Sequence, residues 1–326
     1  EGCEMDIIET FKEAVLSGAE LNRNQALDLW NQPLESLCGA AQELREHFCG
    51  AGFDFCTIIN GKSGRCPENC KYCAQSAHYD TKIEEYPLLD TEKILEEAEA
   101  AVEKGIGRFS IVTSGKKLTD KEVESLCDSY RRLKEEYGLS LCASHGLLSM
   151  EQMAKLKQAG VSRYHNNLET SRRFFPQICT THTYDEKIQT IKNAQAAGLE
   201  VCSGGIIGLG ETPADRVDML LEIRTLNVTC IPLNVLNPIQ GTPLETAEPI
   251  TEDEVCRTAA VFRFLLPRGT IRLAGGRGLF QDKGKQIFEC GANAAISGRL
   301  LTTAGITVEE DLKLIQSLGY RNRHPF

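Results

Sequence analysis

Three cysteines stand close together in the run Cys66-Pro-Glu-Asn-Cys70-Lys-Tyr-Cys73, at the spacing C-x3-C-x2-C. Thiolates are the usual ligands of iron–sulfur clusters, and each of the three can reach a different iron of a four-iron cubane. The neighbouring sequence offers no fourth ligand. A cluster held in this way keeps one iron open, and that iron can bind a small molecule by its amine and carboxylate and pass it an electron.

The same spacing has alternative explanations. A structural zinc site uses four protein ligands, often as two C-x2-C pairs, and the chain has no second pair. A redox-active pair of Cys70 and Cys73 would leave Cys66 without a role, and a chance grouping is the third alternative. An iron–sulfur cluster uses all three thiols. Tyr72 supports it, because an aromatic ring there can lie against the adenine of a bound nucleotide.

The composition limits the classes of protein. The chain has 326 residues and a net charge of −10, which leaves room for one large α/β barrel and gives no basic stripe for nucleic acid. No apolar run approaches the roughly 20 residues of a membrane span, and Glu1–Met5 lack the features of a secretory signal. We therefore expect a cytoplasmic protein with reduced cysteines, some of which, such as Cys127 and Cys256, are simply buried.

Short apolar or β-branched runs alternate with helical patterns, and this alternation predicts a (β/α)8 barrel of the TIM type. Start signals precede several helices, at Thr91, at Thr183 with Glu186, at Thr212 and at Thr251 with Glu254. Active sites of such barrels lie at the C-terminal ends of the strands, where the cysteine run follows the first strand. The predicted strands are 53–59, 109–113, 140–144, 162–168, 200–204, 229–235, 270–273 and 294–296.

The barrel is predicted to span residues 51–303. Residues 1–50 precede the first strand and have helical patterns, so we expect an N-terminal helical extension that caps the barrel or contacts a second copy. Residues 304–326 form a predicted C-terminal tail. Its amphipathic helix carries Leu312, Ile315 and Leu318 on one face.

Several separate runs resemble the biotin synthase family of the radical S-adenosylmethionine superfamily. They occur in the family's order between about Cys56 and Thr303, which makes an accidental likeness very improbable. The runs are SGRCPENCKYCAQS from Ser63, YHNNLETS from Tyr164, VCSGGIIGLGET from Val201, IPLNVLNP from Ile231 and IRLAGGR from Ile271.

The resemblance implies that Cys66, Cys70 and Cys73 ligate a [4Fe–4S] cluster whose open iron binds S-adenosyl-L-methionine. Reductive cleavage would give a 5′-deoxyadenosyl radical that abstracts two hydrogens from dethiobiotin, and an auxiliary cluster would supply the sulfur of biotin. The implied partners are dethiobiotin, an electron donor such as flavodoxin or ferredoxin, and a second copy in a homodimer. A hydrogenase maturase, a methylornithine synthase, and a non-catalytic iron–sulfur or zinc protein remain the alternatives.

The resemblance also assigns contacts with the two small molecules. Glu169 stands where the family carries an acidic residue on the ribose hydroxyls, and residues 204–211 match a glycine pattern that lies along the adenine. Asn167 and Asn234 match asparagines that bind the ureido ring, although such residues also occur simply in turns at strand ends. The implied contacts with S-adenosylmethionine are Tyr72, Asn167, Glu169, Gly204, Ile206 and Gly208.

The chain departs from the family pattern at the auxiliary cluster. Better-known members hold a [2Fe–2S] cluster with three strand cysteines and one arginine, and Cys142, Cys202 and Arg272 match three of those positions. Ser110 stands at the fourth, and a serine oxygen is a poor substitute for a thiolate on iron.

A replacement cysteine is available on the sixth predicted strand. Cys230 lies four residues before Asn234, so the strand period of two places both on the same face. We predict that Cys142, Cys202 and Cys230 hold the auxiliary cluster with Arg272 nearby. Three thiolates suit a four-iron cluster, as in the [4Fe–5S] form of the anaerobe-type branch, with [2Fe–2S] as the alternative. Cys230 could instead be a buried apolar residue; Cys179 is the second choice as ligand, and Cys49, Cys56 and Cys290 are weaker choices.

Overall fold

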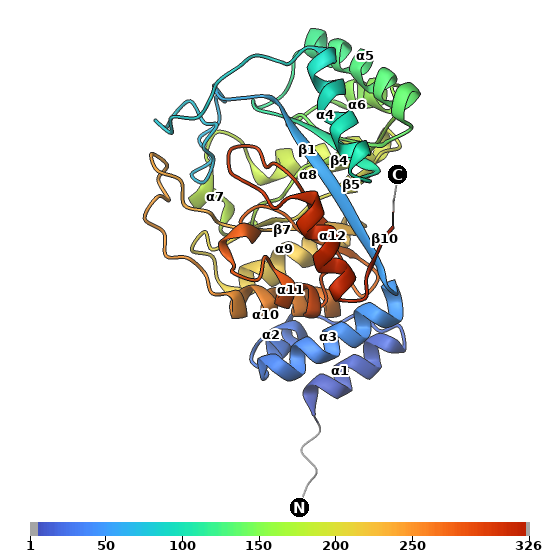
Figure 1. Ribbon diagram of the computed structural model, residues 1–326. Coiled ribbons are helices and arrows are strands. Elements are labelled where there is room, and N and C mark those ends of the chain that lie inside the picture. The colour runs from blue at the N-terminus through green and yellow to red at the C-terminus, as the bar shows by residue number, and fades with distance from the viewer. Residues whose placement is uncertain (1–5, 324–326) are drawn as a thin grey trace, which may run out of the picture.

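The computed structural model describes residues 6–323, so Glu1–Met5, used above for the expected absence of a signal, lie outside the described residues. A closed barrel of parallel strands forms the centre, with helices around it (Figure 1). The first strand, β1 (Gly52–Lys62), closes the barrel by pairing with both β2 (Arg108–Thr113) and β9 (Ala294–Ile296). The other strands are β3 (Ser140–Ser144), β4 (Val161–His165), β5 (Glu200–Cys202) continued by β6 (Gly205–Ile207), β7 (Cys230–Val235) and β8 (Thr270–Leu273).

Each of the eight predicted strands is therefore confirmed, and so is the (β/α)8 barrel. The helices cover the outside of the barrel, since their buried residues recur at helical spacing and face the strands. They are α4 (Thr91–Glu103), α5 (Asp120–Tyr137), α6 (Met150–Gln158), α7 (Phe175–Ile178), α8 (Tyr184–Ala196), α9 (Pro213–Thr225), α10 (Glu252–Leu265) and α11 (Lys285–Glu289).

Two of the predicted helix starts differ in detail from the structure. Helix α4 is capped by Asp90, whose side chain accepts from the Lys93 amide, so Thr91 is its first residue and not its cap. At α10 the Thr251 side chain caps the helix as predicted, but the reciprocal contact from Glu254 is not made. The carboxylate of Glu254 instead pairs with Arg216 Nη1 at 2.7 Å.

The N-terminal helices are α1 (Ile7–Leu16), α2 (Arg23–Trp30) and α3 (Leu34–Cys49), at the lower end in Figure 1. Helix α2 packs against α9 and α10, α3 packs against α10, and α1 packs on α2 and α3. This confirms that residues 7–49 are largely helical. Beyond the barrel, α12 (Val308–Ser317) leads to β10 (Arg321–Asn322), which pairs with the start of β1. The domain boundaries and a contact of the extension with a second copy stay predictions.

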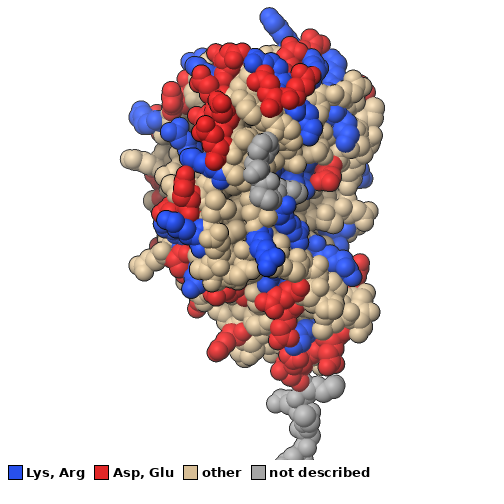
Figure 2. Space-filling view, turned by 45° about the vertical axis from the view of Figure 1, so that its right-hand side comes forward, with Lys and Arg blue, Asp and Glu red and all other residues tan. Residues whose placement is uncertain are grey.

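Figure 2 shows basic and acidic side chains interspersed over one face, with acidic ones gathered at the end where the N-terminal helices lie. Within residues 6–323, no helix is both long and apolar enough to cross a membrane.

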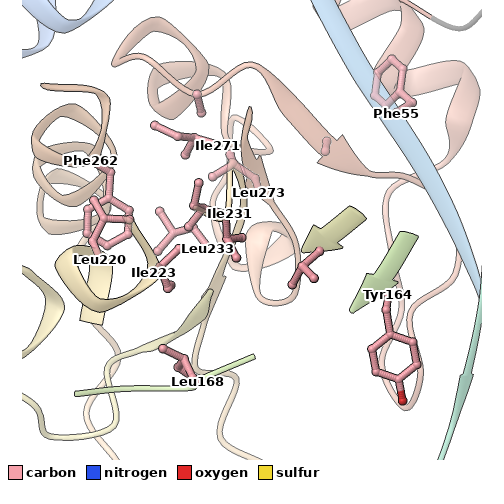
Figure 3. Packing of buried hydrophobic residues seen from close by; sticks show 14 of the residues in the cluster. Phe55, Tyr164, Leu168, Leu220, Ile223, Ile231, Leu233, Phe262, Ile271 and Leu273 are labelled. Atoms are coloured by element: carbon pink, nitrogen blue, oxygen red, sulfur yellow. The ribbon is translucent and has the colours of Figure 1, made fainter. Parts of the chain in front are cut away.

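Alternation along the strands decides which side chains enter the barrel. Figure 3 shows Ile231 and Leu233 of β7, and Leu273 of β8, on the side of the helices that carry Leu220 and Phe262. Residues between them in the chain must point the other way, because successive side chains of a strand alternate. The inward positions on these two strands include Cys230, Pro232, Asn234 and Arg272.

Candidate active site

The cysteine run forms a compact loop after the C-terminal end of β1. The Cys66 amide donates to Gln75 O at 3.0 Å, and the Cys73 amide donates to Cys70 O at 3.0 Å. Burial raises the pKa of the Cys66 thiol and raises that of Cys73 to about 11. These thiols therefore stay protonated until a metal displaces the protons, as thiolate ligands require.

One cavity of about 410 Å³ extends from this loop into the barrel. Its size falls in the range of small-molecule sites. The cavity joins the cysteine loop to residues that the sequence placed on five different strands. Its lining includes Cys66, Tyr72, Cys73, Cys142, Asn167, Glu169, Cys202, Ile206, Asn234 and Arg272.

Glu169 lines this cavity from the loop that follows β4. Its backbone has a φ of 72°, in the left-handed region, and its amide donates to Gly204 O at 3.0 Å. Burial raises the pKa of the Glu169 carboxyl, against hydrogen bonds from Tyr72 and Asn167 that lower it. The Oε2 atom is buried and has no hydrogen-bond partner among the described residues. A buried acceptor of this kind fits a ligand that brings hydroxyl donors.

The glycines of the 204–211 run have a structural reason. A Cβ on Gly204 would lie 1.9 Å from the carbonyl oxygen of Pro232. Only glycine therefore allows the chain between β5 and β6 to come this close to β7. Gly208 has a φ of +93°, which favours glycine for the turn after β6. Ile206 between them lines the cavity and offers it an apolar surface.

The two asparagines both line the cavity, and both also hold the backbone. Asn167 Oδ1 accepts from the Gly204 amide at 3.0 Å. Asn234 donates from Nδ2 to Gly205 O at 3.2 Å and accepts at Oδ1 from the Gly275 amide at 2.8 Å. Their amide groups are therefore fixed in orientation, which favours recognition of a ligand with a matching pattern of donors and acceptors.

Four thiols meet in the barrel, in two pairs. Cys202 Sγ and Cys230 Sγ are 3.0 Å apart, and Cys56 is hydrogen-bonded to Cys142. The hydrogen bond from Cys202, together with the charges of Arg272 and Arg163, lowers the pKa of the Cys230 thiol against the effect of burial. The bond from Cys56 and nearby arginines lower the pKa of Cys142 in the same way. Each pair thus favours one thiolate, the form that binds iron.

A buried ion network surrounds these thiols. The Asp54 carboxylate contacts Arg272 and lies 3.5 Å from Arg108 Nε and 3.9 Å from Arg163 Nη1. Burial alone would raise the pKa of Asp54, but the charges of Arg272, Arg108 and Arg163 lower it to about 2. Arg163 also pairs with the exposed Glu200 at 2.8 Å. Three arginines against two carboxylates leave one positive charge that can offset part of the charge of an anionic cluster.

Part of this group of thiols and charges has only a weak signal in the sequence. Cys56 was a weaker choice, yet it lies beside Cys142, and Asp54 shares its strand face by the period of two in 53–59. Arg108 and Arg163 had no separate signal. Both lie at or near the starts of their strands, β2 and β4, and only the strand register shows that they lie near the thiols. In that register Cys142 pairs with Ser110 on one side and with Arg163 on the other.

The other cysteines lie elsewhere. Cys179, the second choice as auxiliary ligand, contacts Cys70 and His182 beside the cysteine loop instead of the thiols in the barrel. Cys49 lies at the end of α3 against Pro267 O, and Cys290 hydrogen-bonds to Cys256 and Cys38. Cys127 and Cys256 are buried, as expected.

Models of known families and curated relatives agree with this arrangement. Residues 62–223 match the Radical SAM superfamily and residues 232–321 match the Biotin and Thiamin Synthesis associated domain. The fold and the cysteine loop therefore define a radical SAM enzyme.

Biotin synthase from Clostridium botulinum (strain Alaska E43 / Type E3) is 57% identical over 316 residues, which cover 97% of this chain and 99% of that protein. Biotin synthase from Akkermansia muciniphila is 57% identical over 319 residues, with 98% and 99% covered. The chain belongs to the biotin synthase family.

Solved structures support the fold. A methylornithine synthase structure superimposes with a TM-score of 0.82 at 20% identity, covering 96% of this chain and 97% of that one. The FeFe-hydrogenase maturase HydG from Carboxydothermus hydrogenoformans gives 0.84 at 16% identity, covering 97% and 79%. At these identities the likeness concerns the barrel and says nothing of the substrate.

Proposed function

We propose that this chain converts dethiobiotin to biotin by radical S-adenosylmethionine-dependent sulfur insertion. The observation that carries the proposal is the single cavity that joins the cysteine loop to paired thiols inside the barrel. Such a cavity allows a substrate to meet both a radical source and a sulfur source without leaving the protein. Family membership makes dethiobiotin the substrate that fits this arrangement.

Cys66, Cys70 and Cys73 would hold a [4Fe–4S] cluster with S-adenosylmethionine on its open iron. Bound there, this group supplies an electron and a 5′-deoxyadenosyl radical. The unpartnered Oε2 of Glu169 would accept from the ribose hydroxyls, and Ile206 with Tyr72 would enclose the adenine. The barrel wall would shield the bound groups from bulk water on the side of the strands, which protects a reactive carbon radical from side reactions.

The luminal thiols fit an auxiliary iron–sulfur cluster. Cys142, Cys202 and Cys230 would be its protein ligands, as the sequence indicated, and Cys56 is a further thiol within reach of the same group. The arginines around Asp54 favour thiolates and offset cluster charge. A four-iron cluster of the [4Fe–5S] type suits this ligand set better than [2Fe–2S], because Ser110 replaces one thiol of the standard set.

Dethiobiotin would lie between the two groups. Asn167 and Asn234 face the cavity from the ends of β4 and β7, and their fixed amides can pair with the urea of the ureido ring. An electron donor such as flavodoxin or ferredoxin, and a second copy in a homodimer, complete the proposal. Both come from the family.

One incubation tests the activity. Anaerobically reconstituted, reduced protein is mixed with S-adenosylmethionine and dethiobiotin, and 5′-deoxyadenosine and biotin are measured. We expect both products. 5′-Deoxyadenosine without biotin would indicate a different radical enzyme, and neither product would indicate an iron–sulfur or zinc protein without this chemistry.

A further inference from the structure

A second group of potential metal ligands lies beside the cysteine loop, outside the set just described. One ligand atom from each of Cys70, Cys179 and His182 lies within 4.8 Å of the others. Cys179 and His182 are only 4% and 8% exposed. The sequence around Cys66–Cys73 offered no further ligand, but the fold brings two of them to Cys70 from a segment more than 100 residues away.

The geometry suits one small ion. Zinc bonds of about 2.3 Å to sulfur and about 2.0 Å to nitrogen, at tetrahedral angles, place the two ligand atoms about 3.5 Å apart. Cys179 Sγ lies 3.9 Å from Nε2 of His182, so a small movement of either side chain brings the two atoms to that separation. Two thiolates and one imidazole are a donor set for zinc or ferrous iron, and not for calcium or magnesium.

Glu68 orients the imidazole. Its carboxylate contacts His182 Nδ1 and is itself only 7% exposed. Accepting from Nδ1 leaves Nε2 as the nitrogen that is free to bind a metal. A carboxylate on the far nitrogen is the usual support for a metal-bound histidine.

The two segments are also fixed to each other by hydrogen bonds. The Lys71 amide donates to Ile178 O at 3.0 Å, and the Asn69 amide donates to Thr181 Oγ1 at 3.1 Å. The Thr180 amide donates back to Asn69 Oδ1 at 3.0 Å. The ligand atoms are therefore held near their positions before any ion arrives, which lowers the cost of ordering them.

We propose that Cys70, Cys179 and His182 bind one zinc or ferrous ion in the cluster-free protein, with Glu68 supporting His182. Since the proposed function makes Cys70 a cluster ligand as well, this ion and the [4Fe–4S] cluster exclude each other. Zinc at this site therefore blocks cluster assembly, and removing it precedes assembly.

The first test uses Co²⁺ as a spectroscopic probe of the full-length, cluster-free chain under anaerobic conditions. Thiolate-to-cobalt charge-transfer absorption reports binding, and other thiols contribute a background. We expect Cys179→Ala and His182→Gln to bind about one equivalent less Co²⁺ than wild type. Cys127→Ala removes a buried cysteine on α5 and serves as the matched control, with binding unchanged. Equal binding by all four proteins would overturn the proposal.

The second test follows cluster assembly with and without equimolar Zn²⁺, by iron and sulfide content and by electron paramagnetic resonance of the reduced cluster. We expect zinc to slow assembly about tenfold or more in wild type and Cys127→Ala, and much less in Cys179→Ala and His182→Gln. Equal zinc inhibition in the variants would refute the site. A wild-type chain that assembles no cluster without zinc would contradict the proposed function instead, and the cobalt measurement would still decide on the metal site.

Discussion

The two groups of cysteines at the ends of the cavity are positioned by different means. Cys66, Cys70 and Cys73 lie within eight residues of one loop, so their spacing in the chain is nearly their spacing in space. Cys56, Cys142, Cys202 and Cys230 come from four strands and meet only because the barrel closes with a particular register. A local motif can be recognised in a sequence, whereas the members of a luminal group can be recognised only after the strands that carry them have been placed.

The largest expected effect comes from breaking the local group. Cys73→Ala removes one of the three proposed cluster ligands, and we expect that the two remaining thiols do not retain the cubane. We expect 5′-deoxyadenosine formation to fall by about 10³-fold or more, with loss of about four iron atoms per chain. Cys127→Ala should keep both. Retention of activity by Cys73→Ala would remove the radical assignment.

Breaking the luminal group should separate the two halves of the reaction. Cys230→Ala is expected to lose auxiliary-cluster iron and to lower biotin formation about 100-fold or more, while 5′-deoxyadenosine formation continues. The parallel variant Cys56→Ala shows whether the fourth thiol is a ligand or a neighbour of Cys142. Iron and sulfide counts on both variants provide the measurement. An unchanged auxiliary cluster in Cys230→Ala would eliminate Cys230 as a ligand.

Between the two groups, Glu169→Gln tests the proposed contact with the ribose. The substitution keeps the shape of the side chain but removes a charged acceptor, which costs about 1.5–3 kcal/mol. We expect kcat/KM for S-adenosylmethionine to fall about 10- to 150-fold. The rate of 5′-deoxyadenosine formation against cofactor concentration measures it, with the exposed Glu97→Gln on α4 as control. An effect no larger than that of the control would place the ribose elsewhere.

The smallest effect concerns the barrel wall behind the thiols. His145 is buried between Thr113 Oγ1 at 3.0 Å and Tyr130 Oη at 2.9 Å, and burial lowers its pKa from 6.5 to about 3. Between these values the unfolded chain binds a proton that the folded chain does not, so stability falls as the pH drops below 6.5. His145 contributes a slope of up to about 1.4 kcal/mol per pH unit.

Urea unfolding of the cluster-free chain at several pH values between about 4 and 7 measures this slope. In His145→Gln we expect the slope of unfolding free energy against pH to be smaller, by at most the contribution of one proton. The control His47→Gln, at an exposed position on α3, should leave this slope unchanged. Equal slopes in all three proteins would mean that His145 is protonated in the folded state.

Much of the architecture was predictable from local patterns. Strand alternation and helix starts depend on neighbours within a few residues, which is why all eight strands were found. One exception was local, since Asp90 caps α4 in place of its neighbour Thr91. The other arose where a distant partner competed for a side chain: the Glu254 carboxylate pairs with Arg216 and does not complete the cap of α10. The structure brings many of the predicted site residues together in or beside one cavity, and their roles as ligands stay predictions. Asp54, Arg108 and Arg163 were not predicted, because their contacts depend on which strand ends face each other.

The sequence by itself determined the barrel, the loop of Cys66, Cys70 and Cys73, and the family, because these depend on residue order and short spacing. Only the tertiary structure decided that Cys56 meets Cys142, that Asp54 gathers three arginines, and that Cys179 and His182 stand beside Cys70. Those contacts depend on strand register and on a loop from the far side of the chain. Separation along the chain says little about whether two side chains meet across a barrel, because the register of the strands decides which side chains lie next to each other.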